Sequence, residues 1–197
     1  MNQQTFIFIG RSGCGKGTQA RLLSDYLKKL RPEQNSVYIS SGAELREFIK
    51  GDTLTQKLAK QIYDKGGLQP EFLIVNLWAG ALVRDYTGTE NIIMDGMPRK
   101  YHEAGVLDSI FDYYSLPRPL VIHLEISNEE STKRLLARKR FDDIAEEIAN
   151  RLSWYDTDVV PTIEYYRQNK KYRLIDVDGE RSIEEIHKDI IAAINAK

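Results

Sequence analysis

The sequence predicts an α/β fold in which a central five-stranded parallel sheet lies between two layers of helices, a three-layer sandwich. Five short, nearly continuously apolar segments, typical of strands covered on both faces, occur at residues 5–9, 37–40, 91–95, 120–126 and 172–177. Longer amphipathic segments separate them. Such alternation is typical of parallel strands joined by right-handed helical crossovers.

Helical spacing of apolar residues is clearest near the two ends of the chain. The residues expected on the buried faces are Ala20, Leu23, Leu27 and Leu30 in the first helical segment and Ile183, Ile186, Ile190 and Ile194 in the last. Their spacing indicates helices that bury one face. Two helices should begin at capping boxes, Ser127-x-x-Glu130 and Ser182-x-x-Glu185.

Length and composition limit the class of protein. The 197 residues suffice for one domain with a hydrophobic core, and 28 basic against 29 acidic residues leave a formal charge of -1. This balance argues against a general nucleic-acid binder or a polybasic membrane binder. The single cysteine, Cys14, excludes an internal disulfide framework, and no apolar run reaches membrane length. We therefore expect a cytoplasmic monomer that binds neither nucleic acid nor membrane.

A glycine-rich loop follows the first expected strand. Residues 10–18 read GRSGCGKGT and lead into a helical segment, which is the context of a true P-loop. Backbone N–H groups of such a loop converge on phosphate oxygens, and the helix N-terminus adds positive potential. Lys16 is expected to place its ammonium on the β- and γ-phosphate oxygens. The residues expected to bind ATP here are Gly10, Gly13, Cys14, Gly15, Lys16, Gly17 and Thr18.

The candidate magnesium residues depart from the usual P-loop pattern. Gly17 follows the P-loop lysine, where most P-loops have a Ser or Thr that binds Mg²⁺, and the hydroxyl comes one position later, at Thr18. Asp95 ends an expected strand at the carboxyl edge of the sheet, where open α/β sheets bind ligands. We interpret Asp95 as a Walker-B-like carboxylate that orients the waters of Mg²⁺, with Thr18 as a weak additional ligand. The alternative for Asp95 is a helix cap.

Six further motifs follow the P-loop along the chain. They are ISSGAELR at residues 39–46, GLQP at 67–70, IMDGMPR at 93–99, RLLAR at 134–138, RFDD at 140–143 and RL at 151–152. With the G-K-G-T form of the P-loop, they resemble the motifs of nucleoside monophosphate kinases and, most of all, of the adenylate kinase family. The resemblance covers essentially the whole chain. It implies reversible phosphoryl transfer from Mg·ATP to a nucleoside monophosphate.

The resemblance also implies which residues bind the substrates. Phosphoryl transfer needs convergent cations rather than a protein nucleophile, and the planar fork of arginine binds phosphate at two points. The catalytic set is expected to be Lys16, Arg99, Arg138, Arg140 and Arg151, of which Arg138 also binds ATP. The residues expected to bind the monophosphate are Ser41, Arg46, Gln69, Gly96, Arg99, Glu103, Arg140 and Arg151. Taken alone, the cluster at 138–140 would be interpreted as a solvated turn. Asp142 and Asp143 are candidates for bracing its arginines.

The same resemblance divides the single P-loop kinase domain into a core, an insert and a lid. The core is expected at residues 1–40, 74–137 and 144–197, the helical insert that binds the monophosphate at about 41–73, and a very short lid at about 138–143. The lid carries no cysteines, so we expect no structural zinc.

The acceptor base depends on a few side chains. In adenylate kinases, a glutamine a few residues after the D-G-F-P-R motif reads adenine, and this chain has Glu103 there. An ionised carboxylate only accepts hydrogen bonds, so it suits the two N–H donors of guanine better than adenine N1. Ser41 favours AMP, whereas Gln69 adds a polar group near the expected base. We predict AMP as the acceptor. GMP, or UMP or CMP, is the alternative, and Glu103 could also face solvent and read no base.

Two other classes of protein share a P-loop. A non-catalytic nucleotide sensor would keep the loop and show no transfer. A GTPase switch would need an N-K-x-D segment, and the nearest string, NKKY at residues 169–172, lacks the aspartate. We also expect Trp78 and Trp154 to pack in the core rather than to stack on a base.

Overall fold

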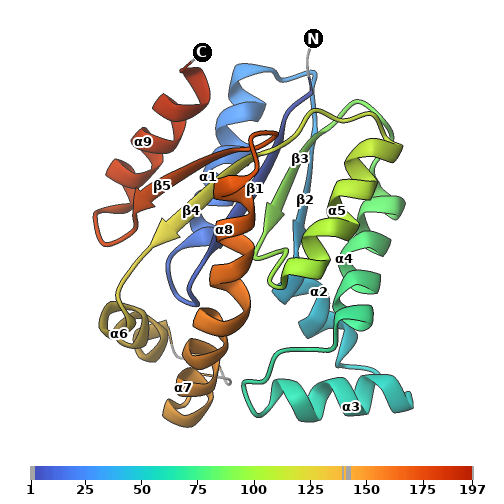
Figure 1. Cartoon of the computed structure of the whole chain (residues 1–197), viewed down its shortest axis with the longest axis vertical. Helices are drawn as coiled ribbons and strands as arrows, with labels where there is room; N and C mark the ends of the chain where they lie inside the picture. Colours follow the sequence, from blue (N-terminus) through green and yellow to red (C-terminus); the bar gives the residue numbers. More distant parts are fainter. Residues whose placement is uncertain (1–2, 139, 141–142, 197) are drawn as a thin grey trace.

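The five strands run parallel in one sheet, in the order β2-β3-β1-β4-β5 (Figure 1). The computed structural model describes residues 3–138, 140 and 143–196. β1 (Thr5–Gly10) is central, β3 (Asn91–Asp95) and β4 (Leu120–Glu125) flank it, and β2 (Ser36–Ser40) and β5 (Arg173–Asp178) form the edges. These bounds agree with the expected ranges to within one residue at either end, which confirms the α/β fold class.

The strand register brings three chain segments to one edge of the sheet. Asp95 lies opposite Phe8 of β1 on one side and opposite Ser40 of β2 on the other. The P-loop follows β1 two residues beyond Phe8. Because parallel strands share their carboxyl edge, the segments that leave β1, β2 and β3 all start beside one another, at the edge where open α/β sheets bind ligands.

One apolar core lies between the sheet and the pair α1 (Lys16–Leu30) and α9 (Ile183–Asn195). Phe8 and Leu23 are fully buried there, and each such side chain contributes about 1.5–3 kcal/mol through burial. The expected helix faces are confirmed except at their outer ends. Leu30, at the end of α1, is exposed, as is the first residue of α9.

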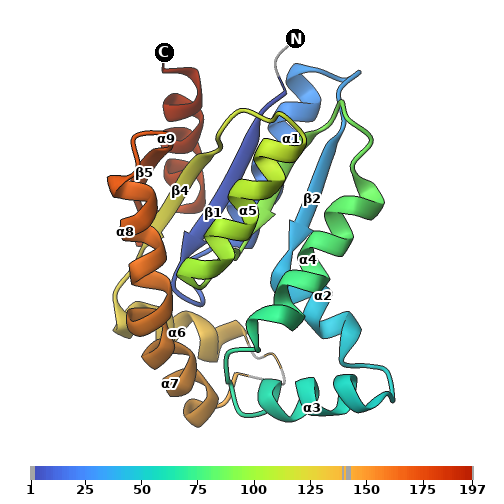
Figure 2. The same cartoon turned by 45° about the vertical axis from the view of Figure 1, so that its right-hand side comes forward.

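A second core fills the opposite face of the sheet. It is covered by α4 (Glu71–Asp85), α5 (Tyr101–Tyr113) and α8 (Val160–Gln168), which lie in front of the strands in Figure 2. Trp78 of α4 and Phe111 of α5 are fully buried in it. The expectation that Trp78 packs in the core is therefore confirmed.

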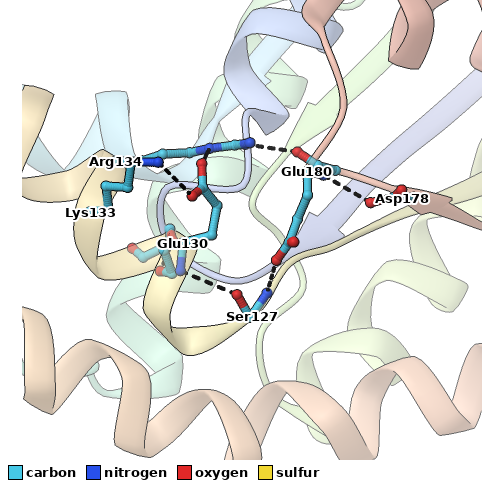
Figure 3. Close-up of polar contacts among 9 residues, drawn as sticks. Ser127, Glu130, Lys133, Arg134, Asp178 and Glu180 are labelled. Carbon is cyan, nitrogen blue, oxygen red and sulfur yellow. Dashed lines mark hydrogen bonds and ion pairs between the residues drawn. The ribbon is translucent and has the colours of Figure 1, made fainter.

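Only one of the two expected capping boxes is complete. At the start of α9, Ser182 and Glu185 each accept a hydrogen bond from the other's backbone N–H. Near the start of α6 (Asn128–Arg138), the N–H of Glu130 donates to Ser127 Oγ at 3.2 Å. The N–H of Ser127 donates instead to Glu180 Oε1 at 2.8 Å, and the Glu130 carboxylate turns to Arg134, 2.7 Å away (Figure 3). A guanidinium one turn along the helix is a stronger partner than a neutral backbone N–H because it carries charge.

The remaining helices gather beyond the carboxyl edge of the sheet (Figure 2). α2 (Ser41–Phe48) and α3 (Leu54–Tyr63) follow β2, and α6 (Asn128–Arg138) and α7 (Ala145–Trp154) follow β4. A π-helical turn, η1 (Tyr155–Val159), joins α7 to α8.

The expected insert contains α2 and α3, and the expected lid at 138–143 lies between α6 and α7. Residues 139, 141 and 142 of that lid, including Asp142, lie outside the described residues. The division into core, insert and lid stays a prediction. None of the helices in the described ranges combines the length and the apolar character needed to cross a membrane.

Candidate active site

A cavity of about 620 Å³ opens at the carboxyl edge of the sheet, between the P-loop, α2, the arginines of α6 and α7, and the start of α9. Among the described residues, its walls carry nine cationic side chains and one carboxylate, that of Asp95. The cations are Lys16, Arg21, Arg46, Arg99, Arg134, Arg138, Arg140, Arg151 and Arg181. A pocket of this size suits a small ligand, and such an excess of positive charge concentrates anions.

Lys16 lies across the P-loop at the start of α1. Its ammonium donates to the carbonyl oxygens of Gly10 and Arg11, at 2.7 and 2.6 Å, and lies 3.4 Å from the Cys14 sulfur. Cys14 is fully buried in the core beneath α1, so it acts as a small packing residue. No described side chain caps α1 and no acid lies in its first turn, which leaves the backbone N–H groups there available to an anion.

Gly10 does not reach the cavity wall, although the sequence predicted it as an ATP-binding residue. A Cβ at Gly10 would lie 2.3 Å from the carbonyl oxygen of Leu124, so glycine allows β1 to approach β4 closely at this point. The other six residues expected to bind ATP through the loop line the cavity: Gly13, Cys14, Gly15, Lys16, Gly17 and Thr18.

Asp95 lies between the first turn of α1 and Tyr38 of β2. The Tyr38 hydroxyl donates to Asp95 Oδ2 at 2.8 Å, and a Cβ at Gly17 would lie 3.2 Å from the same oxygen. Burial, followed by the charge of Asp95, raises the pKa of Tyr38 above its usual value, so the hydroxyl keeps its proton and acts as a donor. The missing side chain at Gly17 leaves room for the carboxylate.

The two residues assigned to magnesium, Asp95 and Thr18, both line the cavity beside the P-loop. Within the described residues, no three His, Cys, Asp or Glu side chains cluster into a metal-binding group. One carboxylate and one hydroxyl fit Mg²⁺, which usually keeps several waters and binds through one or two carboxylates plus substrate phosphates.

Arg99 anchors the part of the cavity next to α2. Its Nε donates to the carbonyl oxygen of Gly96 at 3.0 Å and its Nη2 to the hydroxyl of Ser41 at 3.3 Å. Ser41 Oγ donates to the same Gly96 carbonyl at 2.7 Å. Burial lowers the pKa of Arg99, and the nearby carboxylates of Glu103 and Asp95 oppose this shift. The guanidinium stays cationic, as arginine does in proteins.

Asp143 gathers arginines on the other side of the cavity. Its carboxylate accepts hydrogen bonds from Arg138 Nε and Nη2, at 2.8 and 2.7 Å, and from Arg151 Nη2 at 3.2 Å. The backbone N–H of Arg140 donates to it at 3.1 Å. Burial alone would raise the pKa of Asp143, but these hydrogen bonds and the arginine charges outweigh burial and lower it. Asp143 therefore braces the arginines, as the sequence indicated.

Glu103 and Gln69, the expected base readers, are buried and do not line the cavity. Glu103 Oε2 accepts from the backbone N–H of Arg99 at 2.8 Å, and Gln69 Nε2 donates to the carbonyl oxygen of Ala59 at 2.9 Å. Among the described residues, Oε1 of each side chain has no hydrogen-bond partner. Burial raises the pKa of Glu103, against the opposing effect of Arg99. Their role in reading the base stays a prediction.

Arg134 lines the cavity but was not assigned a role from the sequence. Its Nε donates to Glu130 Oε1 at 2.7 Å and its Nη1 to the carbonyl oxygen of Gly179 at 2.8 Å (Figure 3). These contacts hold the guanidinium between α6 and the segment before α9. A signal was present, because Arg134 precedes Arg138 by four residues and so shares its helix face.

Ile183 and Trp154 also line the cavity. Trp154 is partly buried and packs against the second core, as expected. Ile183 is 51% exposed, although its helical spacing predicted burial. The Trp154 indole N–H donates to the carbonyl oxygen of Gly66 at 3.0 Å, and its ring lies 5.4 Å from the Arg99 guanidinium carbon, within the range of a cation–π contact. Trp154 therefore supports a cavity arginine rather than the core alone.

Comparison with known proteins points to one family along almost the whole chain. A family model described as Adenylate kinase matches residues 8–171. The adenylate kinase of Methanocella arvoryzae is 33% identical, with 96% of this chain and 97% of the relative covered. Adenylate kinase 1 of Nostoc sp. is 32% identical, with 96% and 98% covered. The adenylate kinase of Leptospira biflexa is 34% identical, with 95% and 98% covered.

Proposed function

Because this chain belongs to the adenylate kinase family, it is a nucleoside monophosphate kinase, and we propose that it transfers the γ-phosphoryl group of Mg·ATP reversibly to AMP, giving two ADP. The observation that carries the proposal is the convergence of Lys16, Arg46, Arg99 and Arg151 on one cavity. These cations come from four separate chain segments, and their combined positive charge favours the binding of polyanions between them.

On the donor side, the P-loop binds the phosphates of ATP. The backbone N–H groups at the start of α1 would contact the phosphate oxygens, and Lys16 would exchange its two carbonyl partners for the β- and γ-phosphates. Thr18 and Asp95 would hold the accompanying Mg²⁺, Asp95 through water. Magnesium supplies neutralisation of the charge on the phosphate oxygens.

On the acceptor side, Arg46 and Arg99 hold the phosphate of the monophosphate. The contacts of Arg99 with Gly96 and Ser41 orient its guanidinium in advance, and preorganised donors cost no rearrangement during the reaction. Arg138, Arg140 and Arg151 then contact the transferring group, with Asp143 as their common brace. Arginine contributions of this kind reach about 10³–10⁵ in rate in related reactions.

Closure over the substrates would complete the site. The insert at 41–73 and the short lid at 138–143 would move over the bound nucleotides. Closure excludes water, which otherwise accepts the phosphoryl group in place of the monophosphate.

The acceptor base has two candidates. The adenylate kinase names of the relatives and the hydroxyl of Ser41 support AMP. The carboxyl group of Glu103 favours guanine, whose adjacent N–H donors match an ionised carboxylate. AMP is the proposal because the likeness to relatives named adenylate kinase extends along almost the whole chain, and water or a rotamer change can compensate for one polar substitution.

The test is phosphoryl transfer from Mg·ATP to AMP, GMP, CMP and UMP, with the nucleoside diphosphates separated by ion-exchange chromatography. We expect the highest kcat/KM with AMP. A higher kcat/KM with GMP, UMP or CMP would show that this nucleotide is the acceptor, and the assignment as a nucleoside monophosphate kinase would stand. If no phosphoryl group is transferred to any of the four, the proposed function is wrong and the alternative of a non-catalytic nucleotide sensor is favoured.

A further inference from the structure

Tyr38 lies on β2 and places its hydroxyl group beside Asp95, the carboxylate proposed to hold magnesium through water. No other residue of β2 has been given a role at the magnesium site. The Tyr38 ring is half-buried and packs against the core beneath α1. In the strand register, Tyr38 lies opposite Ile93 of β3. Ile93 and Asp95 face the same side of the sheet because alternate residues of a strand do so. The packed ring therefore directs its hydroxyl to Asp95 from the neighbouring strand.

The contact involves only one oxygen of Asp95. The Tyr38 hydroxyl lies 2.8 Å from Oδ2, and a Cβ at Gly17 would lie 3.2 Å from that same oxygen. Oδ2 is thus enclosed by Tyr38 and the first turn of α1. Asp95 itself lines the cavity, whereas Tyr38 is not among the described residues that do. Tyr38 can therefore act on a ligand only through the carboxylate.

We propose that Tyr38 is a positioning residue for phosphoryl transfer, whose hydroxyl holds the Asp95 carboxylate in one orientation and leaves Oδ1 to the water shell of the magnesium ion that accompanies ATP. This inference rests on the proposed function. Most P-loops place a Ser or Thr hydroxyl at the position of Gly17. In this chain, the hydroxyl beside Asp95 comes from β2 instead.

The hydrogen bond matters because the terminal torsion of an aspartate is broad and roughly two-fold. Without a donor on Oδ2, the carboxylate of Asp95 would rotate, and fewer molecules would present Oδ1 to the metal-bound water. Tyr38→Phe removes only the hydroxyl and keeps the ring in its packing position, so the fold should persist.

The experiment measures metal affinity directly, apart from turnover. Mn²⁺ serves as the probe, because the electron paramagnetic resonance signal of free Mn²⁺ reports how much has bound to the enzyme·ATP complex. We expect Tyr38→Phe to weaken Mn²⁺ binding by about three- to tenfold, as loss of one net hydrogen bond does. The KM for AMP should stay unchanged, and the Mg²⁺ concentration for half-maximal activity should rise by a similar factor.

Tyr26→Phe is the matched control. Tyr26 packs half-buried in the same core, and its hydroxyl accepts a hydrogen bond from Asn195 at 3.4 Å. Unchanged Mn²⁺ affinity in a folded Tyr38→Phe variant would overturn the role of Tyr38. Phosphoryl transfer by the wild-type protein would still support the proposed kinase function in that case. If Tyr38→Phe melts at a lower temperature than wild type, Tyr38→Leu, which keeps an apolar side chain without a hydrogen-bond donor, repeats the measurement. Lack of transfer by the wild-type protein with every monophosphate overturns the proposed function instead.

Discussion

Arg138 and Asp143 form a two-point ion pair, with both carboxylate oxygens accepting from one guanidinium at 2.7 and 2.8 Å. The Asp143 side chain is fully buried, whereas that of Arg138 is 32% exposed. The same carboxylate binds Arg151 at 3.2 Å, so it ties the end of α6 to α7 across the expected lid. One buried negative charge thus holds two arginines together before any nucleotide is present.

Asp143→Asn should lower both activity and stability. The amide keeps the shape of the side chain but loses the negative charge that Asp143 places between Arg138 and Arg151. We expect kcat to fall by about 10- to 100-fold, as for a misplaced catalytic group. The free energy of unfolding should fall by about 2 kcal/mol, less than the ~3–5 kcal/mol of a fully buried pair because Arg138 reaches water. Initial rates and urea unfolding measure the two effects.

Glu146→Gln is the control for this prediction, since it removes one negative charge from an exposed position near the start of α7. Equal kcat values for Asp143→Asn and Glu146→Gln would show that Asp143 does not orient the arginines.

Lys16→Ala should abolish most transfer and leave the fold intact. The ammonium is the P-loop cation at the phosphates, and loss of one such group costs about 10²–10³ in kcat. Its contacts in the structure are with loop carbonyls and the Cys14 sulfur, so circular dichroism should be unchanged. Lys29→Ala, at an exposed position of the same helix, should keep full activity. Near-normal turnover by Lys16→Ala would refute the role of Lys16.

Glu103→Gln should raise the use of AMP relative to GMP, UMP and CMP. The amide supplies an N–H donor for adenine N1, whereas an ionised carboxylate opposes its lone pair, a difference of about 1–3 kcal/mol. The measurement is the ratio of kcat/KM values among the four acceptors. Glu129→Gln, on the exposed side of α6, should leave that ratio unchanged. If Glu103→Gln does the same, Glu103 does not face the base.

Asp176 should contribute stability that depends on pH. It accepts from Arg167 at 2.5 and 3.0 Å and lies 2.7 Å from His123 Nδ1. Hydrogen bonding from Arg167 is the largest cause that lowers the pKa of Asp176 to about 2, whereas an unfolded aspartate has a pKa of about 3.9. A depressed native pKa stabilises the fold above the unfolded value, and this contribution is lost as the pH falls through the native value.

Asp176→Asn should therefore be less stable than the wild-type protein at pH 7, and the gap should close between about pH 4 and pH 2. Urea midpoints at several pH values provide the measurement. Asp25→Asn, at an exposed position of α1, is the control. A gap of constant size down to pH 2 would contradict the depressed pKa.

Local patterns were sufficient to predict the elements and the motif positions. The strand 91–95 was predicted with its observed bounds because continuous apolar runs between helical segments have few other interpretations. The capping box at Ser182 formed because all its partners lie within three residues. The box at Ser127 formed only in part because Glu180, far away in sequence, accepts from the Ser127 N–H and Arg134 binds the Glu130 carboxylate.

Counting residues from a motif predicted poorly which side chains point into the cavity. Counting from Arg99 finds Glu103, and counting from the P-loop finds Gly10, yet neither lines the cavity. Glu103 binds the backbone N–H of Arg99, and Gly10 lies against the Leu124 carbonyl. The Gly10 contact depends on how β1 approaches β4, which spacing along the chain does not encode, whereas the Glu103 contact spans only four residues.

The α/β class, the P-loop and the positions of the arginines could be predicted from the amino-acid sequence, because each depends on residues that are neighbours along the chain. Only the packed fold shows that Tyr38 binds Asp95 and that Trp154 supports Arg99. The physical reason is that hydrogen bonds and charge interactions act over a few ångströms in space. Residues far apart in sequence can meet that condition only after the sheet and its helices have packed.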